Sequence, residues 1–291
     1  METGGTGMDG VAGKACVVLG TGRAVDARLV EALTAAGARA RLRACAVEGG
    51  PQDGGHVDIF DEEALRAAVR GADVLFCTVA DFSFGRGAAA RAWRANADGA
   101  RMACLAAEAE GVRRMVHCGS ILCLGRQTSD APVDATTPYL SDDSRTAVER
   151  SLFRGEMEVW RAAERGVRAT VVCAGWVEED LRPALEGFLR GGGSTMPPME
   201  SAFVSAAGLA EALVAAAGDD YAGKRVVCAG RNAPLASLAD DIAARLGLGS
   251  PTRVLTDRQT GVLLRLPRRV ASRWLFEPGM GRLLTRRDRY A

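Results

Sequence analysis

Short apolar runs and amphipathic stretches alternate along most of this chain. Apolar runs without internal polar alternation are typical of strands that are buried on both faces of a parallel sheet. The longer stretches between them carry apolar residues at helical spacing. The predicted strands cover residues 15–20, 38–45, 73–80, 114–119, 169–174 and 225–229. The predicted helices cover residues 24–36, 61–69, 86–110, 145–165, 207–217 and 234–246.

This alternation predicts an α/β fold with a doubly wound parallel sheet, whose ligand crevice lies at the carboxyl ends of the strands. We divide the chain into a flexible tail over residues 1–13, a core over 14–175, and a third region over 176–291. The third region is expected to hold the remaining core strands and helices together with a small substrate-binding lobe. The Gly-rich start lacks an apolar stretch, so it predicts neither a secretion signal nor a membrane anchor.

Composition narrows the classes of partner. The chain has 37 basic and 36 acidic residues, a net charge of +1, so no strong field favours nucleic acid or an anionic membrane. A hydrophobic content of 48% is typical of a globular protein, and no apolar run is long enough to span a bilayer. The eight cysteines lie mostly inside apolar runs and form no Cys-x-x-Cys pair. They predict free thiols in the reducing cytoplasm, without a metal site. A small molecule is therefore the expected partner.

The first predicted strand ends in a glycine-bearing turn that leads into a helix. This turn contains Gly20 and Gly22, followed by Arg23. Glycines at such a turn let backbone N–H groups approach a pyrophosphate. Two glycines in a Gly-x-Gly pattern are a weak signal, because many strand–helix connections contain them.

Four further segments carry a family resemblance. They are Val57-Asp58-Ile59-Phe60-Asp61, residues 74–80, residues 96–107 and residues 111–120. Together they resemble the extended short-chain dehydrogenases/reductases, the group of NAD-dependent epimerases/dehydratases and 3β-hydroxysteroid dehydrogenases. The resemblance implies a Rossmann-like fold of the extended type with a small C-terminal substrate lobe. It also implies NAD(P) as the cofactor, with nucleotide contacts at Asp58, Ile59 and Ala80.

The proton relay of that family is missing from this sequence. In the family a tyrosine lies four residues before a lysine, which lowers the pKa of the tyrosine hydroxyl. This chain has lysine only at Lys14 and Lys224, so no Tyr-x-x-x-Lys pattern exists. The family register places Val148 at the tyrosine position and Leu152 at the lysine position.

The predicted cofactor turn has also changed. The family register places Gly20, Arg23 and Asp26 at the three glycines of its motif, and a one-residue deletion would place Gly22 at the second. An arginine can pair with a phosphate, whereas an aspartate repels one. After the second strand, Arg43 is the residue left to meet a 2′-phosphate. The sequence therefore leaves binding of NAD(P) open.

Three residues are candidates for chemistry. Ser120 follows the predicted strand over residues 114–119, where its hydroxyl can polarise a carbonyl, although a turn serine fits the same position. Asp81 follows the predicted strand over residues 73–80 beside an aromatic residue, with a solvated loop aspartate as the alternative. Tyr139 can reach inward from its loop or cap the core. The substrate pocket is predicted around Phe82, Val148, Leu152 and Trp176.

Three functions follow from these observations. The leading hypothesis is a non-redox isomerase, cyclase or lyase that acts on a small apolar metabolite, polyketide-like or polycyclic. The alternatives are an NAD(P)-dependent reductase or epimerase with a substitute acid, and a ligand-binding pseudoenzyme with a regulatory role. The resemblance also implies a homodimer that pairs the helices over residues 92–110 and 145–165.

Overall fold

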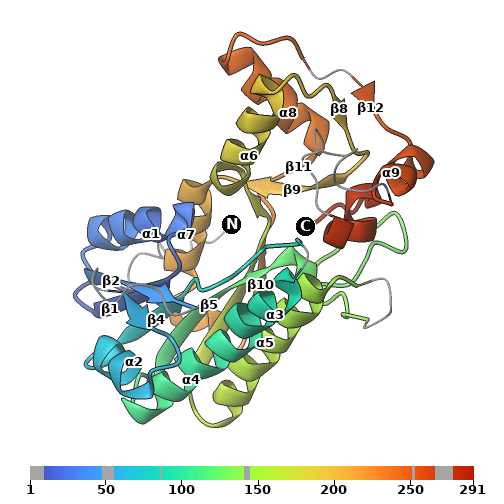
Figure 1. The fold of residues 1–291 in the computed structure, drawn as a ribbon. Coiled ribbons are helices and arrows are strands. Elements are labelled where there is room, and N and C mark those ends of the chain that lie inside the picture. The colour runs from blue at the N-terminus through green and yellow to red at the C-terminus, as the bar shows by residue number, and fades with distance from the viewer. Residues whose placement is uncertain (1–9, 48–55, 86, 141–144, 251–252, 266–277) are drawn as a thin grey trace, which may run out of the picture.

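The computed structural model describes residues 10–47, 56–85, 87–140, 145–250, 253–265 and 278–291. Within them, seven parallel strands form the central sheet in the order β10-β6-β5-β4-β1-β2-β3 (Figure 1). The strands are β1 (Ala15–Gly20), β2 (Arg39–Ala46), β3 (Val57–Asp58), β4 (Val74–Cys77), β5 (Arg114–Ser120), β6 (Arg168–Ala174) and β10 (Arg225–Cys228). The strand order reverses between β1 and β4, so a crevice is expected at their carboxyl ends. The predicted doubly wound sheet is confirmed.

Helices cover both faces of this sheet. One face carries α1 (Ala24–Ala35) and α7 (Ala206–Ala215); the other carries α2 (Glu62–Val69), α4 (Gly99–Ala109) and α5 (Ala147–Glu164). Successive residues of a strand point to opposite faces. In β1, Val18 therefore packs with the α1 and α7 side, whereas Val17 and Leu19 pack with the α2, α4 and α5 side. This two-sided burial explains the unbroken apolar runs.

The helical stretch predicted over 86–110 is confirmed for residues 88–109, and it contains a π-helical turn. Residue 86 lies outside the described residues, and the rest divides into α3 (Ala88–Trp93), a π-helical turn η2 (Arg94–Asp98) and α4. The π turn contains Asn96, whose Oδ1 accepts from the N–H of Asp81 at 2.7 Å. Its Nδ2 donates to Asp81 O at 2.9 Å and to Ser151 Oγ at 3.0 Å. The wider turn thus brings one amide into contact with both the loop after β4 and α5.

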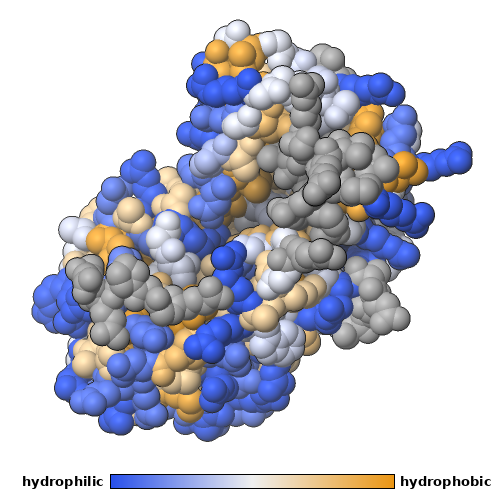
Figure 2. Space-filling view, viewed as in Figure 1, coloured by the Kyte–Doolittle hydropathy of each residue, from blue (hydrophilic) through white to orange (hydrophobic). Residues whose placement is uncertain are grey.

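A smaller lobe follows β6 and lies over the carboxyl ends of the core strands (Figure 1). It contains a three-stranded sheet in the order β11-β9-β7 and a two-stranded sheet of β12 and β8. Its elements are β7 (Trp176–Val177), α6 (Glu178–Arg190), β8 (Thr195–Met196), β9 (Glu200–Val204), β11 (Arg231–Pro234), α8 (Leu235–Arg245), β12 (Arg253–Val254) and α9 (Asp257–Leu263). Figure 2 shows the visible face hollowed between core and lobe.

The last residues of the predicted N-terminal tail, 10–13, pack against the core. Residues 1–9 lie outside the described residues, but Val11 is fully buried among residues of α1 and α7. The N–H of Gly13 also donates to Gly37 O at 2.9 Å. Residues 10–13 are therefore part of the core, because a buried valine and a backbone hydrogen bond fix them.

A buried arginine connects several elements at the amino-terminal edge of the sheet by hydrogen bonds. Arg114, at the start of β5, is only 6% exposed. Its guanidinium donates to Ala217 O and Gly218 O at 3.1 Å, just beyond the end of α7, and to Thr170 Oγ1 at 2.7 Å. These bonds join β5, β6 and α7 without a carboxylate partner.

Candidate active site

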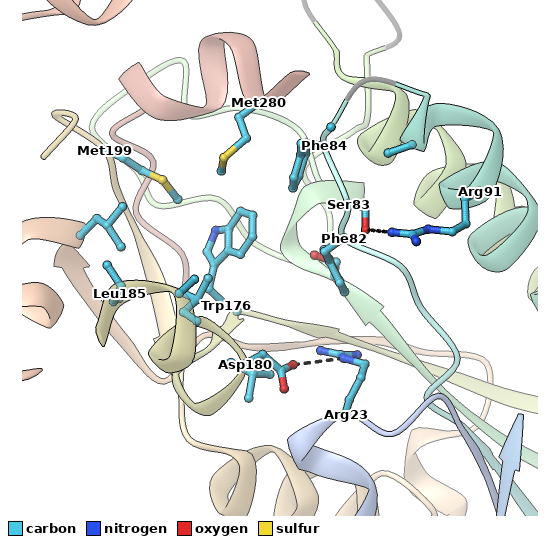
Figure 3. A pocket seen from close by; sticks show the side chains of 18 of the residues that line it. Arg23, Phe82, Ser83, Phe84, Arg91, Trp176, Asp180, Leu185, Met199 and Met280 are labelled. Carbon is cyan, nitrogen blue, oxygen red and sulfur yellow. Dashed lines mark hydrogen bonds and ion pairs between the residues drawn. The ribbon is translucent and has the colours of Figure 1, made fainter. Parts of the chain in front are cut away.

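A pocket of about 690 Å³ lies between the carboxyl ends of the core strands and the lobe (Figure 3). Its walls are mostly apolar. The core contributes Arg23, Phe82, Ser83, Phe84, Gly85, Gly87, Ala88, Arg91 and Ser120, and the segment after β6 contributes Gly175, Trp176 and Val177. The lobe contributes Asp180, Leu181, Ala184, Leu185, Met199, Leu235 and Met280. A cavity of this size and character is suited to a small, largely apolar molecule.

Three aromatic side chains form one side of the pocket. The ring centroids of Phe82 and Phe84 lie 6.1 and 6.3 Å from that of Trp176. Trp176 is 9% exposed, and its indole N–H has no hydrogen-bond partner among the described residues. The methionine side chains of Met199 and Met280 lie opposite these rings (Figure 3). Aromatic and methionine surfaces adapt to flat apolar ligands.

Asp81 holds the loop after β4 in place through hydrogen bonds and an ion pair. One carboxylate oxygen of Asp81 accepts from the N–H of Ser83 at 2.6 Å, and the other pairs with Arg91 Nε at 2.7 Å. Arg91 also donates to Ser83 Oγ. Asp81 does not line the pocket, so the structure gives it the role of orienting Phe82 and Ser83, not the predicted place beside a substrate.

Ser120 does line the pocket, at the end of β5. It is 4% exposed, and its Oγ accepts from the N–H of Leu122 at 3.2 Å. Within the part of the chain that the structure describes, its hydroxyl proton meets no acceptor. The charged groups on the walls are already paired, Arg23 with Asp180 and Arg91 with Asp81. The Ser120 hydroxyl is therefore free to donate to a ligand.

Tyr139 lies outside the lining of this pocket. Its ring stacks on Phe153, with centroids 4.0 Å apart, and the Arg145 guanidinium lies 4.4 Å above it. Burial raises the pKa of Tyr139 to about 12. This tyrosine caps the core beside α5, and its hydroxyl does not reach Ser120.

Val148 and Leu152 also lie outside the pocket. Both are at most 5% exposed and belong to the core cluster of the α4 and α5 face. The structure does not bring these two residues into the lining of this pocket, whose walls include residues of α3 and α6. Nearby, the buried Glu149 is held by Arg145 and Arg286, each at 2.9 Å. The start of α5 is thus a packed, neutralised core.

The β1–α1 turn contains a second cluster of polar groups. Gly22 has φ +82°, a conformation that favours glycine. The N–H groups of Gly22 and Arg23 both donate to Oδ2 of Asp26 at 2.9 Å. Oδ1 of Asp26 lies 2.5 Å from Thr78 Oγ1. Burial raises the pKa of Asp26 above its usual value, against the lowering effect of these bonds.

A carboxylate from the lobe completes this turn. Asp180, in the first turn of α6, accepts from the N–H of Ala24 at 3.0 Å and from Arg23 Nε at 3.2 Å. The Arg23 guanidinium also lies 5.1 Å from the ring centroid of Phe82. Figure 3 shows this ion pair on the pocket wall. Arg23 is thereby paired with an internal acid rather than left to meet a phosphate.

The other predicted nucleotide contacts are structural or lie apart from the pocket. Asp58 Oδ1 accepts from the N–H of Phe60 at 2.9 Å, Ile59 is fully buried, and Ala80 O accepts from Thr21 Oγ1 at 3.3 Å. Arg43 is half-buried on β2. The pocket lining therefore includes Ser120, Phe82, Trp176 and Arg23 among the predicted site residues. It does not include Arg43, Asp58, Ile59 or Ala80.

Several pocket residues could not be found from the sequence. The lobe residues Leu185, Met199, Leu235 and Met280 follow no motif, and Asp180 meets the turn across 156 positions. A signal for Asp180 existed in the run Glu178-Glu179-Asp180, because acids at the start of a helix often cap neighbouring groups. The other two acids pair with Arg231 and with the N–H of Ala206.

The cysteines fit the expectation from the sequence. All eight are free, and seven are buried. Among the described residues no group of His, Cys, Asp and Glu could hold a metal ion, and no helix is long and apolar enough to cross a membrane.

Comparison with known proteins identifies the family. The sequence model of the NAD(P)H-binding family matches residues 20–220, more than half of the chain. This chain belongs to the NAD(P)H-binding family. Its fold is that of the extended short-chain dehydrogenases/reductases, as the resemblance predicted.

Individual relatives are distant. Sterol demethylase protein B of Methylococcus capsulatus is 29% identical over 181 residues, which are 59% of this chain. The match spans about half, 54%, of that relative's length. The structure of gox2253 superposes with a TM-score of 0.77 at 22% identity, covering 96% of this chain and 90% of the other. The Bordetella bronchiseptica enzyme WbmH, in complex with NAD+, gives a TM-score of 0.66 at 17% identity, covering 83% and 85%.

The family implies a dinucleotide, and the β1–α1 turn does not fit its pyrophosphate. The first amides of a helix after a glycine turn hold such an anion. Here the amides of Gly22, Arg23 and Ala24 already donate to two carboxylates. An added phosphate would lack these donors and would lie beside two acids.

Proposed function

We propose that the protein binds a small, largely apolar metabolite, polycyclic or polyketide-like, and converts it by non-redox chemistry such as isomerisation, cyclisation or elimination. The observation that carries this proposal is the pocket itself. Its walls are aromatic and aliphatic, its charged groups are paired, and Ser120 presents a free hydroxyl at the strand ends. The relative named for sterol demethylation agrees with a polycyclic substrate class.

Ser120 supplies the polar step of this proposal. Its Oγ–H donates to a carbonyl oxygen of the bound molecule and polarises that carbonyl, so that negative charge building up on the oxygen is stabilised. The surrounding apolar walls exclude water, which strengthens that hydrogen bond. The same walls hold the ligand in a reactive conformation.

Ser120→Ala tests this role. We expect turnover to fall by about 100-fold or more, the usual effect of removing one such donor, while the ligand dissociation constant changes little. The ligand is first identified by mass spectrometry of small molecules released from the denatured protein. Ser83→Ala is the matched control, because Ser83 also lines the pocket but is hydrogen-bonded to Arg91. Unchanged turnover in Ser120→Ala would contradict the proposal, and binding without any turnover would favour a pseudoenzyme.

An NAD(P)-dependent reductase or epimerase is the second candidate, favoured by the family match. It requires a substitute for the missing tyrosine, and Tyr139 lies away from the pocket. Steady NAD(P)H oxidation with ketone substrates, at about 1 per second or faster, would establish this candidate in place of the first.

We also propose a homodimer through the helices around α4 and α5. Trp93 and Leu105 are 43% and 39% exposed, although Phe153 is covered by Tyr139. Light scattering at micromolar concentration should report a dimer, and Leu105→Glu should shift it toward monomer because a buried charge disfavours the interface. A strict monomer for the unchanged protein would refute this assembly.

A further inference from the structure

The β1–α1 turn presents three backbone donors, and each of them already has a partner. The N–H groups of Gly22 and Arg23 donate to one oxygen of Asp26, and the N–H of Ala24 donates to Asp180. The first amides of a helix have no partner within the helix and bind an anion when one is present. In this chain, internal carboxylates take all three.

Asp26 fills the inside of the turn. It is 2% exposed, and a Cβ atom added at Gly20 would lie 2.3 Å from its carboxylate. Gly20 is therefore required here for close approach to Asp26. The aspartate takes the space beneath the turn as well as its donors.

Asp180 closes the outer side of the turn. It belongs to α6 of the lobe, and it pairs with Arg23 while it caps Ala24. Its neighbour Glu179 accepts from the N–H of Ala206 at 2.8 Å, at the start of α7. Glu179 and Asp180 thus join α6 to the N-termini of α7 and α1 by hydrogen bonds. This double attachment fixes the position of Asp180.

The negative charges of Asp26 and Asp180 also disfavour a pyrophosphate at this turn, in addition to their occupation of its backbone donors. A pyrophosphate at this turn would have to displace both carboxylates or lie beside them, where like charges repel. Arg23 cannot offset that repulsion while its guanidinium remains bonded to Asp180.

We propose that Asp26 and Asp180 replace the pyrophosphate of the dinucleotide, so that the protein does not bind NAD(P) and α6 is latched to α1 instead. The Arg23–Asp180 pair then forms a permanent wall of the ligand pocket. This inference is independent of the reaction proposed above, because it concerns the turn and not Ser120.

The test is a titration of NADH and NADPH, followed by nucleotide fluorescence and calorimetry, into three forms of the full chain. The unchanged protein should show no saturable binding up to about 1 mM. Asp26→Gly combined with Asp180→Ala frees the three amides and should gain at least about tenfold in affinity. Asp26→Asn combined with Asp180→Asn keeps oxygen acceptors at both positions and should bind no better than the unchanged protein.

The outcomes separate the parts of the proposal. Saturable micromolar binding by the unchanged protein would overturn it, and so would a folded Gly/Ala variant that gains nothing. An equal gain by the Asn pair would show that charge, not occupancy of the donors, excludes the dinucleotide. Thermal unfolding checks that each variant is folded. If the double variant does not fold, Asp180→Ala alone frees Ala24 and Arg23 and should still gain several-fold; no gain there would refute the replacement.

Discussion

The β1–α1 turn and the apolar pocket share one edge of the sheet and treat polar groups in opposite ways. In the turn, three backbone donors converge on two carboxylates. In the pocket, the Ser120 hydroxyl and the Trp176 indole N–H have spare hydrogen-bonding capacity. Buried polar groups need partners. The backbone donors of the turn are bonded within the chain and are not available to a ligand. The donors of the pocket have no partner among the described residues and can bond to a ligand.

Two buried titratable groups, one near the pocket and one in the turn, are expected to change the stability of the fold with pH in opposite ways. Below the pocket, burial lowers the pKa of His117 to about 4, from 6.5. In the turn, burial raises the pKa of Asp26. Burial disfavours the charged form of both groups relative to the unfolded chain, but one group is a base and the other an acid. Their contributions to folding therefore change in opposite directions as the pH falls.

The largest effect is expected from His117. Below pH 6.5 the unfolded chain binds a proton at this position that the folded chain refuses, so stability falls until the pH reaches about 4. A shift of this size corresponds to about 3 kcal/mol. Urea unfolding between pH 7 and 4 should show this loss in the unchanged protein, and His117→Leu should remove it. The exposed His56, replaced by Leu, is the control. A profile unchanged by His117→Leu would show that His117 is not the source.

Asp26→Asn tests the opposite pH dependence in the same urea-unfolding experiment. Because the folded pKa of Asp26 is raised, the ionised carboxylate destabilises the folded state as the pH rises above the usual aspartate range. The amide has almost the same shape and lacks that titration. Asp26→Asn should therefore gain stability relative to the unchanged protein as the pH rises from 4, and a constant difference would contradict this sign.

The next largest effect tests where ligand recognition lies. Phe82 and Phe60 are half-buried phenylalanines with an arginine beside the ring, Arg23 at 5.1 Å and Arg94 at 3.9 Å. Only Phe82 lines the pocket. With a hydroxyanthraquinone as probe, Phe82→Ala should weaken binding by about 10- to 30-fold through lost aromatic contact. Phe60→Ala should change it less than about twofold. Equal losses would place the binding site elsewhere.

The strands and helices could be predicted where the local spacing of apolar residues determines them. The run Cys16-Val17-Val18-Leu19 is buried on both faces, and β1 has the predicted bounds. The period of the apolar residues is a local property, so it identifies strands and helices wherever one face or both faces are buried. The break at Asn96 is less visible, because a π turn has nearly the composition of an α-helix.

The site was harder to predict because contacts across the chain make it. Ser120, Phe82 and Trp176 follow strands whose carboxyl ends meet, and that geometry could be anticipated. The family register predicts Val148 in the pocket, but its side chain is buried in the hydrophobic core cluster on the α4 and α5 face. Asp180 was missed for a similar reason, since nothing near it in sequence indicates that its partner is Ala24.

The acids at the start of α6 and the buried Arg114 also determine how α1 and α7 pack together. Both helices begin at the carboxyl edge of the sheet and end at the amino edge, so their macrodipoles lie parallel and repel. Asp180 places negative charge at the positive pole of α1, and Glu179 does so for α7. Arg114 places positive charge at the negative pole of α7. Glu179 and Arg114 screen the field at the two ends of α7, and Asp180 does so at the start of α1, which favours contact between two parallel dipoles.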